Sequence, residues 1–324
     1  MSLYLVTGGA GFIGSHIVEA LVSRGDRVRV LDDLSSGKSH NLAGLDVDGP
    51  GSGATVELMV GDVRDAAACR AAARGVAGIF HEAARVSVPA SIEDPEGSYA
   101  VNVTGTLRVL EAARAEGVER VVFAASSAAY GDCEALPKAE DFPVRPRSPY
   151  AAGKVAAEHL MRVWAQCYGL HTVCLRYFNV FGPRQADDSP YTGVVALFAR
   201  ALLEGDVPTI HGDGEQTRDF TYVDNVVAAN LAALDADVEE PGAVVNVGAG
   251  ERISLNELYG AIADELGVVG DPEYGPGRAG DVRHSLADLT RARRWIGYRP
   301  SVPWREGLRR TLAWYGASLA SARG

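Results

Sequence analysis

The chain has 324 residues, enough to bury a large core as one α/β unit or as two lobes. Its 31 Lys and Arg residues stand against 42 Asp and Glu residues, and the formal net charge of −11 argues against general binding to nucleic acid or anionic membranes. The four cysteines form no C-x-x-C pair and have no histidines at ligand spacing, so neither a metal site nor a disulfide framework is indicated. Apolar runs stay below the roughly 18 residues of a membrane span, so we expect a soluble, cytoplasmic protein with reduced thiols.

The N-terminal residues turn from an apolar strand, predicted at 3–6, directly into a helix predicted at 12–24. The glycines of this turn fit two dinucleotide-binding spacings at once, and they are Gly8, Gly9, Gly11 and Gly14. One glycine makes the tight turn, another lets pyrophosphate approach the backbone, and the last lets helix and strand pack closely. The helix N-terminus then favours the anion. On this motif alone, a glycine-rich turn without a ligand remains the alternative.

The second strand, predicted at 27–31, ends in Asp32, 18 residues after Gly14. In a dinucleotide-binding fold, a carboxylate at this place accepts hydrogen bonds from the adenosine ribose and repels a 2′-phosphate, which predicts NAD rather than NADP. The alternative is that Asp32 only begins the following loop. Residues 33–53 are rich in Gly, Ser, Asp and Pro without an apolar period, and we predict that they form that surface loop.

Two further strands, predicted at 56–60 and 78–81, end beside residues suited to contact a cofactor. The residues after these strands are Asp62, Val63, Ala83 and Ala84. The first pair falls where adenine would lie, and the second pair has small side chains that let a cofactor approach closely. His81 ends the later strand without a nucleophile or carboxylate motif, so we interpret it as a packed residue rather than a base.

A long helix is predicted at 95–115 and an apolar strand at 118–125, which completes five β-then-α units. This order predicts an α/β fold of the Rossmann type with a doubly wound parallel sheet. We expect residues 1–175 to form the cofactor-binding domain, residues 220–250 to return to it, and residues 176–324 to form mainly a smaller α/β substrate lobe. Further helices are predicted at 150–168, 192–204, 223–236, 255–266, 286–296 and 304–320, and strands at 171–176, 209–214 and 244–247.

Tyr150 and Lys154 lie four residues apart at the start of a predicted helix, and therefore on one face. A free tyrosine titrates near pH ~10, and a neighbouring ammonium lowers that pKa, so Lys154 is expected to help Tyr150 act as a general base. Ser126 ends the strand at 118–125 and brings a hydroxyl to the same carboxyl edge of the sheet. The spacing Tyr-x-x-x-Lys occurs by chance in many helices, so it carries weight only together with Ser126.

The glycine turn, the strand end at Ser126 and Tyr150-x-x-x-Lys154 together resemble the extended short-chain dehydrogenase/reductase family over nearly the whole chain. Within it, residues 175–184, 212–220 and 278–281 resemble the nucleotide-sugar branch, above all the UDP-hexose 4-epimerases. The resemblance implies that Tyr150 takes the proton of a sugar 4-hydroxyl while hydride leaves C4 for NAD, with Ser126 bonded to the same oxygen. The resulting 4-keto sugar would turn over and take the hydride back on its other face.

The resemblance also implies a set of ligand contacts. The implied cofactor residues are Gly8, Gly11, Phe12, Ile13, Gly14, Asp32, Asp33, Leu34, Ser36, Gly37, Asp62, Val63, Ala83, Ala84, Asn102, Ala124, Ala125, Tyr150, Lys154, Tyr177 and Val180. The implied substrate residues are Val86, Ser87, Ser126, Tyr150, Asn179, Val194, Val195, Thr209, His211, Arg218, Arg278, Asp281 and Ser285. No metal is implied.

The substrate residues divide by the part of the sugar nucleotide that they would contact. By the resemblance, Asn179, Arg218 and Arg278 would hold the diphosphate, which suits charge-assisted arginine contacts, and Asp281 the ribose. The uracil contacts would be Thr209 and His211, under a loop with Val194 and Val195. Without the resemblance, surface ion pairs remain the less favoured alternative for the two arginines.

Two features distinguish members of the nucleotide-sugar branch. In 4,6-dehydratases an Asp-Glu pair follows the catalytic hydroxyl, whereas this chain has Ser127 and Ala128 there, which disfavours dehydration. Ser285 stands where the family places a gate beside the sugar 2-substituent, and a serine admits acetamido sugars. The stretch at 86–89 also resembles acetamido-sugar epimerases, whereas Ala279 departs from the proline or charged residue common in the family.

We therefore expect a UDP-sugar 4-epimerase that acts on UDP-glucose and UDP-galactose and on their N-acetylated counterparts. The alternatives are another sugar-nucleotide enzyme of the branch, such as a UDP-uronic acid epimerase or decarboxylase or a 4,6-dehydratase, and a non-catalytic NAD-sensing regulator. A regulator has no need of Ser126, Tyr150 and Lys154 together. The resemblance further implies a homodimer formed through the helices at 95–115 and 150–168.

Overall fold

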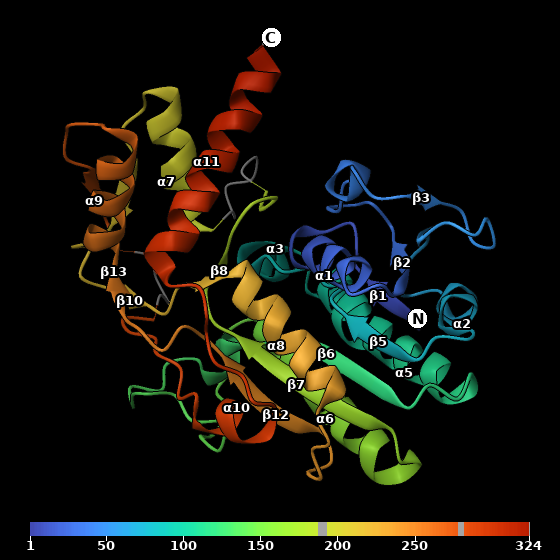
Figure 1. Ribbon diagram of the computed structural model, residues 1–324. Coiled ribbons are helices and arrows are strands. Elements are labelled where there is room, and N and C mark those ends of the chain that lie inside the picture. Colours follow the sequence, from blue (N-terminus) through green and yellow to red (C-terminus); the bar gives the residue numbers. More distant parts are fainter. Residues whose placement is uncertain (187–192, 278–281, 324) are drawn as a thin grey trace.

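The computed structural model describes residues 1–186, 193–277 and 282–323, and an eight-stranded parallel sheet lies at the centre of this part of the chain (Figure 1). Its strands, in order across the sheet, are β12 (Ala243–Val247), β7 (His171–Tyr177), β6 (Arg120–Ser126), β5 (Gly78–His81), β1 (Leu3–Thr7), β2 (Arg27–Asp32), β4 (Val56–Val60) and β3 (Val47–Asp48). The order reverses at β1, which has β5 on one side and β2 on the other. A crevice opens at the carboxyl ends of strands at such a reversal, and ligands bind there. The predicted doubly wound, Rossmann-type sheet is confirmed.

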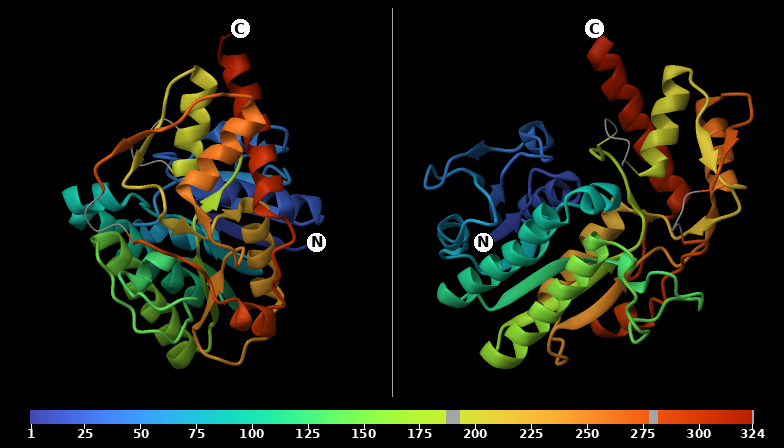
Figure 2. Two further views of the ribbon diagram at one scale, coloured as in Figure 1. Left: turned by 90° about the vertical axis from the view of Figure 1, so that its left-hand side faces the viewer. Right: turned by 180° about the vertical axis from the view of Figure 1, so that it is seen from behind.

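Apolar side chains of the strands alternate between two buried layers, one on each face of the sheet. In β1, Val6 belongs to one layer and Leu5 to the other. The helices over the first layer are α1 (Phe12–Ser23) and α8 (Val223–Asp235), and those over the second are α2 (Ala66–Ala73), α5 (Thr106–Ala115) and α6 (Pro149–Tyr168). Figure 2 shows α5 and α6 side by side across the sheet when the molecule is seen from behind. Because both faces are covered, the central strands are apolar throughout.

A second group of elements follows β7 and gathers beyond one end of the sheet (Figure 1). Its helices are α7 (Val194–Glu204), α9 (Leu255–Leu266) and α11 (Trp304–Arg323), while α10 (Thr290–Trp295) packs against β12. Its short strands form three pairs, β8 (Val180–Phe181) with β11 (Thr221–Tyr222), β9 (Thr209–His211) with β14 (Glu273–Gly275), and β10 (Thr217–Arg218) with β13 (Ile253–Ser254). Among the helices described, none is both long and apolar enough to cross a membrane.

The helix predicted at 95–115 is helical but irregular. It consists of α4 (Pro95–Tyr99), a π-helical turn (Ala100–Gly105) and α5, and it follows α3 (Val88–Glu93). Such π turns carry an extra residue and often occur at functional sites. Here the turn directs Asn102 to the main chain of Arg85, where Oδ1 accepts from the N–H at 2.9 Å and Nδ2 donates to the carbonyl at 3.0 Å. The turn thereby holds the segment that leaves β5.

The helix predicted at 286–296 is wrong in its first half, because only α10 is present there. The N–H of Asp288 donates to the carbonyl of Lys138 at 2.9 Å, and the N–H of Ala287 donates to the buried carboxylate of Asp219 at 3.0 Å. The carbonyl of Leu286 in turn accepts from the N–H of Lys138 at 2.7 Å, and this bond takes an acceptor that a helix would have used. The apolar residues just before α10 therefore lie in an irregular segment that hydrogen-bonds to residues distant in sequence.

Residues 33–53, predicted as a loop, contain two short pieces of regular structure. A 3-10 turn (Ser39–Leu42) and β3 interrupt the irregular chain, and β3 pairs with β4 at the edge of the sheet. The N–H of Lys38 and the side-chain Nδ2 of Asn41 both donate to the carbonyl of Ala10, at 2.9 and 2.8 Å. The loop is thus fastened to the turn between β1 and α1.

That turn depends on unusually close main-chain packing. Gly8 adopts a φ of 68°, a left-handed conformation in which a side chain is strained. A Cβ on Gly14 would lie 2.2 Å from the carbonyl oxygen of Gly8, which is far closer than atoms can approach. The third motif glycine, Gly11, is the N-cap of α1 and donates its N–H to the same oxygen at 3.0 Å. The glycines therefore let α1 start directly at the end of β1.

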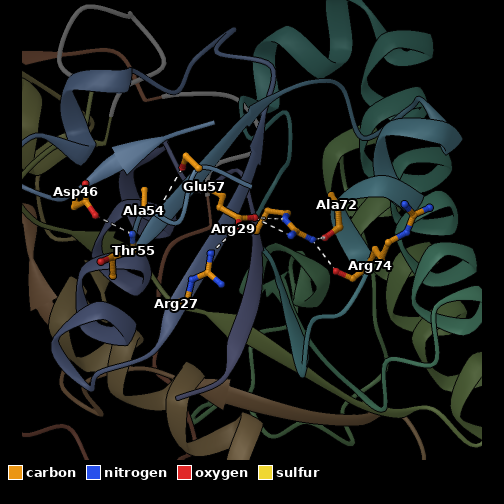
Figure 3. A network of polar contacts seen from close by, with 9 residues as sticks. Arg27, Arg29, Asp46, Ala54, Thr55, Glu57, Ala72 and Arg74 are labelled. Atoms are coloured by element: carbon orange, nitrogen blue, oxygen red, sulfur yellow. Dashed lines mark hydrogen bonds and ion pairs between the residues drawn. The ribbon is translucent and has the colours of Figure 1, made fainter. Parts of the chain in front are cut away.

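The buried carboxylate of Glu57 stabilises the part of the sheet where β2 and β4 lie side by side (Figure 3). Glu57 of β4 accepts from Arg27 and Arg29 of β2, each at 2.8 Å, and is 3% exposed. Arg29 also donates to the carbonyls of Ala72 and Arg74 at the end of α2, at 3.0 and 2.8 Å. This network joins two strands and a helix at a place remote from the crevice.

Replacing Gly14 with alanine is expected to destabilise the protein by about 1–3 kcal/mol, because the new methyl group collides with the main chain of Gly8. Gly260 is a matched control, since it also lies inside a helix but a Cβ added there would meet nothing within 4 Å. Gly260→Ala should leave stability unchanged or raise it by up to about 1 kcal/mol. Urea unfolding of both variants measures the difference. Equal stability of Gly14→Ala and the parent protein would contradict the close packing.

Candidate active site

A large cavity of about 1790 Å³ runs along the carboxyl ends of the strands, from the glycine turn to the group of elements beyond the sheet. The predicted site residues that line it are Gly8, Gly11, Phe12, Ile13, Gly14, Asp32, Asp33, Ser36, Gly37, Asp62, Val63, Ala83, Ala84, Val86, Ser87, Ala124, Ala125, Ser126, Tyr150, Lys154, Tyr177, Asn179, Val180, Val194, Thr209, His211, Arg218 and Ser285. Segments far apart in the chain therefore meet around one space.

Three of the predicted site residues that the structure describes do not line this cavity, and two more cannot be placed. Arg278 and Asp281 lie outside the described residues. Val195 of α7 is 2% exposed, and its side chain packs in the core. The side chain of Asn102 hydrogen-bonds to the main chain of Arg85. Leu34 has a left-handed φ of 59° and contributes its main-chain N–H, rather than its side chain, to Asp32.

Asp32 joins the glycine turn to the loop after β2. Its Oδ2 accepts from the N–H of Ala10 and its Oδ1 from the N–H of Leu34, both at 2.9 Å. Burial raises the pKa of this carboxyl, and the two amide bonds oppose that rise. A Cβ on Gly37 would lie 2.7 Å from Oδ1, so the loop passes directly over the carboxylate.

The residues around the glycine turn fit a dinucleotide. The amides at the N-terminus of α1 open onto the cavity, the first turn of that helix has no acidic residue, and its N-cap has no capping side chain. A Cβ on Gly8 would lie 2.7 Å from the main-chain nitrogen of Ala83, so backbone rather than side chains forms the floor here. An anionic pyrophosphate suits these amides, and the ribose hydroxyls suit the carboxylate of Asp32.

Three polar side chains meet at the carboxyl end of β6. Ser126 is the last residue of that strand, and its hydroxyl accepts from the N–H of Ala128 at 3.2 Å. Lys154 of α6 is 3% exposed and donates from Nζ to the carbonyl of Ala124 at 2.7 Å. Tyr150, one turn earlier on the same helix, lines the same cavity, and Ser126 is close enough to lower the pKa of its phenol. The structure thus brings together the serine, tyrosine and lysine that the sequence proposed.

The expectation that Lys154 lowers the pKa of Tyr150 is wrong for the side chains as the chain arranges them. Burial raises the pKa of Tyr150 above its usual value, and the hydrogen bond with Ser126 only partly opposes that effect. Burial likewise lowers the pKa of Lys154, whereas Glu82 and then Glu158 raise it. The neutral tyrosine is therefore the favoured form, and it is a hydrogen-bond donor to an oxygen placed beside Ser126.

The far end of the cavity is built around β10. Arg218 donates from Nη1 to the carbonyls of Thr217 and Arg283, at 3.0 and 3.3 Å. The N–H of Ser285 donates to the same carbonyl of Thr217 at 3.1 Å, so this serine and Arg218 lie side by side. Because both residues donate to the carbonyl of Thr217, the distance between the guanidinium of Arg218 and the side chain of Ser285 is fixed.

Two acidic residues, one that lines the cavity and one buried outside its lining, had no signal strong enough to be singled out in the sequence. Glu82 lines the cavity immediately after β5 and accepts from the hydroxyl of Tyr177 at 2.9 Å. Asp219 is fully buried, accepts from the N–H groups of Ala249 and Ala287, and burial raises its pKa to about 6. An acidic residue at the end of a buried strand is the sequence signal that identified Asp32. The same signal would have identified Glu82, which follows β5.

In the described residues, no group of three or more His, Cys, Asp or Glu side chains could hold a metal ion.

Comparisons with known proteins agree with this architecture. The family model of the NAD dependent epimerase/dehydratase family matches residues 4–248. A UDP-glucose 4-epimerase of Mycolicibacterium smegmatis is 43% identical over 96% of this chain and 97% of its own length. The structure of a UDP-N-acetylglucosamine 4-epimerase from Methanobrevibacter ruminantium, in complex with UDP-N-acetylmuramic acid, superposes with a TM-score of 0.91 at 38% identity, over 98% of this chain and 99% of the other.

A UDP-glucose 4-epimerase of Thermus thermophilus, solved in complex with NAD, superposes with a TM-score of 0.85 at 41% identity, over 97% of this chain and 98% of the other. The matches extend over the glycine turn, the strand ends and the elements beyond the sheet. The chain belongs to the NAD-dependent epimerase/dehydratase family.

Proposed function

We propose that this chain is a UDP-hexose 4-epimerase that uses NAD and interconverts UDP-glucose with UDP-galactose and UDP-N-acetylglucosamine with UDP-N-acetylgalactosamine. The observation that carries the proposal is the meeting of Ser126, Tyr150 and Lys154 at the middle of one cavity, with the dinucleotide cradle at one end and Arg218 at the other. Relatives named as 4-epimerases of UDP-glucose and UDP-N-acetylglucosamine support this choice.

NAD, when bound, supplies the group that takes a hydride from C4 of the sugar and returns it, so oxidation and reduction balance over one turnover. Only the ionised form of Tyr150 can act as a base, so it is the phenolate that takes the proton of the 4-hydroxyl in the first half-reaction and gives it back in the second. Ser126 hydrogen-bonds the same oxygen and holds it beside the phenol. The 4-keto sugar turns over between the two halves, which requires that Arg218 keep the diphosphate while the hexose moves.

The same geometry disfavours dehydration. Ser127 and Ala128 follow the catalytic serine and line the cavity, but neither has a group that transfers a proton at C5 or C6. In our assignment residues 1–175 and about 220–250 hold NAD, and the rest of 176–324 holds the UDP-sugar, with Arg278 on the diphosphate and Asp281 on the ribose. The four cysteines are free thiols, which fits the cytoplasmic location that we propose.

Tyr150→Phe is expected to lower the rate of epimerisation by about 10²-fold or more, because the phenol oxygen is the proton acceptor. NAD should remain bound in stoichiometric amount, as measured by absorbance after release from the purified protein. Tyr168→Phe is the control, since Tyr168 is exposed at the other end of the same helix. A Tyr150→Phe variant with near-normal turnover, or a parent protein that acts only on non-UDP sugars, would refute the proposal.

Ser285→Tyr is expected to lower kcat/KM for the N-acetylated pair by roughly tenfold or more relative to the plain pair, because a large ring would occupy the room for the acetamido group. Ser285→Ala is the matched control and should leave the ratio nearly unchanged. Rates on both substrate pairs, measured on each variant, give the comparison. An unchanged ratio in Ser285→Tyr would show that this position is not the gate.

We also propose a homodimer, formed through the helices at 95–115 and 150–168, which are α4 to α5 and α6. Exposed apolar side chains lie on α4 and α6, with Tyr99 40% and Val163 44% exposed, and Ile92 of the preceding α3 is 62% exposed. Light scattering at micromolar concentration should give about twice the chain mass of 34.2 kDa, and Val163→Asp should shift it toward the single-chain value. A parent protein that is monomeric under these conditions contradicts the dimer.

A further inference from the structure

Asp219 is a buried acidic residue directly after β10, at the end of the cavity where Arg218 lies. Its side chain is 0% exposed, and both of its oxygens accept from main-chain N–H groups. Oδ1 accepts from Ala249 at 2.7 Å, and Oδ2 accepts from Gly250 at 3.1 Å and from Ala287 at 3.0 Å. The roles proposed above for the residues of the cavity make no use of this acid.

The segment that carries Ser285 pairs with β10 in the manner of a parallel strand. The N–H of Thr217 donates to the carbonyl of Arg283 at 3.0 Å, and the carbonyl of Thr217 accepts from the N–H of Ser285 at 3.1 Å. In a parallel ladder, the next acceptor belongs to the residue two positions further along the strand. Asp219 stands there, and its side chain accepts from the N–H of Ala287. The carboxylate therefore continues the pairing past Ser285, which is held on both sides.

The other two amides belong to the turn that follows β12. This turn passes so close that a Cβ on Gly248 would lie 2.7 Å from Oδ2 of Asp219 and 2.6 Å from the Cβ of Ala287. The carboxylate thus joins β10, the turn after β12 and the segment of Ser285. Because β12 is a strand of the central sheet, the segment of Ser285 is tied to that sheet as well as to β10.

A carboxylate suits this place because both of its oxygens accept hydrogen bonds and neither donates. All three N–H groups therefore find a partner. An asparagine has one acceptor oxygen and an NH₂ group that donates, so at least one of the three N–H groups would face another donor. Burial raises the pKa of Asp219 to about 6, so the ionised carboxylate is the main form at neutral pH.

The hydrogen bonds of Asp219 act on two residues that line the cavity. Arg218 lies on β10 and Ser285 on the segment that the carboxylate joins to it. Ser285 itself has a main-chain bond to Thr217, and the bond from Ala287 to Asp219 lies two residues further on. Without the second bond, the segment can move away from β10 beyond its bond to Thr217. The room between the guanidinium and the serine would then change.

We propose that Asp219 is a positioning residue, whose carboxylate holds the segment of Ser285 at a fixed distance from Arg218 and thereby sets the room for the 2-substituent of the hexose. The tie between the three segments follows from the hydrogen bonds alone. Its effect on the choice of substrate rests on the proposed 4-epimerase function.

Asp219→Asn tests this role because it keeps the shape of the side chain and removes one acceptor. We expect KM for UDP-glucose to rise about tenfold while kcat falls by less than about threefold, since the side chains at the carboxyl end of β6 are unchanged. The ratio of kcat/KM between the N-acetylated and the plain pair should move by about threefold or more, because Ser285 is held on one side only.

Tyr298→Phe is the matched control. The hydroxyl of Tyr298 donates to the carbonyl of Gly248 at 2.8 Å, so the variant loses a buried hydrogen bond in the same turn but keeps the three bonds of Asp219. Both KM and the substrate ratio should stay within about twofold of the parent values.

Amide hydrogen exchange tests the tie without turnover. In Asp219→Asn the amides of Ala249, Gly250 and Ala287 should exchange about tenfold faster than in the parent protein, because local opening becomes easier, while the amides of β1 should not change. In the parent protein the coupling is reciprocal. If the tie favours the sugar nucleotide, then saturating UDP-glucose should slow the exchange of the Ala287 amide.

An unchanged KM and substrate ratio in Asp219→Asn would overturn the proposal, and so would equal changes in Tyr298→Phe. If Asp219→Asn does not fold, exchange in the parent protein decides, and UDP-glucose that binds without slowing the exchange of Ala287 would overturn it. A parent protein inactive on every UDP-sugar, with faster exchange still observed in Asp219→Asn, would refute the proposed function and leave the tie between the three segments standing.

Discussion

The contact of α1 with β1 is the constraint on which the rest of the site depends, because it brings three strand ends to one turn. The main chain of Gly14 packs against the carbonyl of Gly8, with no room for a Cβ between them. The same turn directs the N–H of Ala10 to Asp32 at the end of β2, and it sets Gly8 against the main chain of Ala83 beyond β5. A wider turn would separate these neighbours. The position of Asp32, which we propose as the acceptor for the ribose, and the open floor of the cavity therefore both follow from the closeness of one helix to one strand.

The positions of Tyr150 and Lys154, which we propose as catalytic, depend on a second contact, the packing of α6 against the sheet. Glu158 of α6 and Arg176 of β7 form a two-point ion pair whose side chains are 6% and 3% exposed. Because desolvation offsets much of the attraction in a buried pair, its main consequence is orientation, and it holds the helix at one rotation about its axis. Lys154 lies one turn before Glu158, and Tyr150 one turn before Lys154. The fixed rotation therefore directs both side chains to the cavity at the carboxyl end of β6, where Lys154 bonds to the carbonyl of Ala124.

What could be predicted from the sequence depends on how local the physical signal is. The glycine turn, the apolar strands and the spacing of Tyr150 and Lys154 are local patterns, and they predicted the sheet and the edge at which the site lies. The helix predicted at 286–296 failed in its first half because the carbonyl of Leu286 accepts from the main chain of Lys138, far away in sequence. The direction of the Tyr150 pKa was missed for a similar reason, since burial by distant segments outweighs a lysine one turn away.

A chain with a formal net charge of −11 must still attract two phosphate-bearing ligands into one cavity, so its acids there have to be neutralised from within. Asp32 accepts from two main-chain amides, and Glu82 accepts from the hydroxyl of Tyr177. Burial raises the pKa of both carboxyls, which weakens their preference for the charged form. The N-terminal residues of α1 line one end of the cavity and Arg218 lines the other, and helix amides and a guanidinium both favour an anion. The cavity is thus locally receptive to anions within an acidic protein.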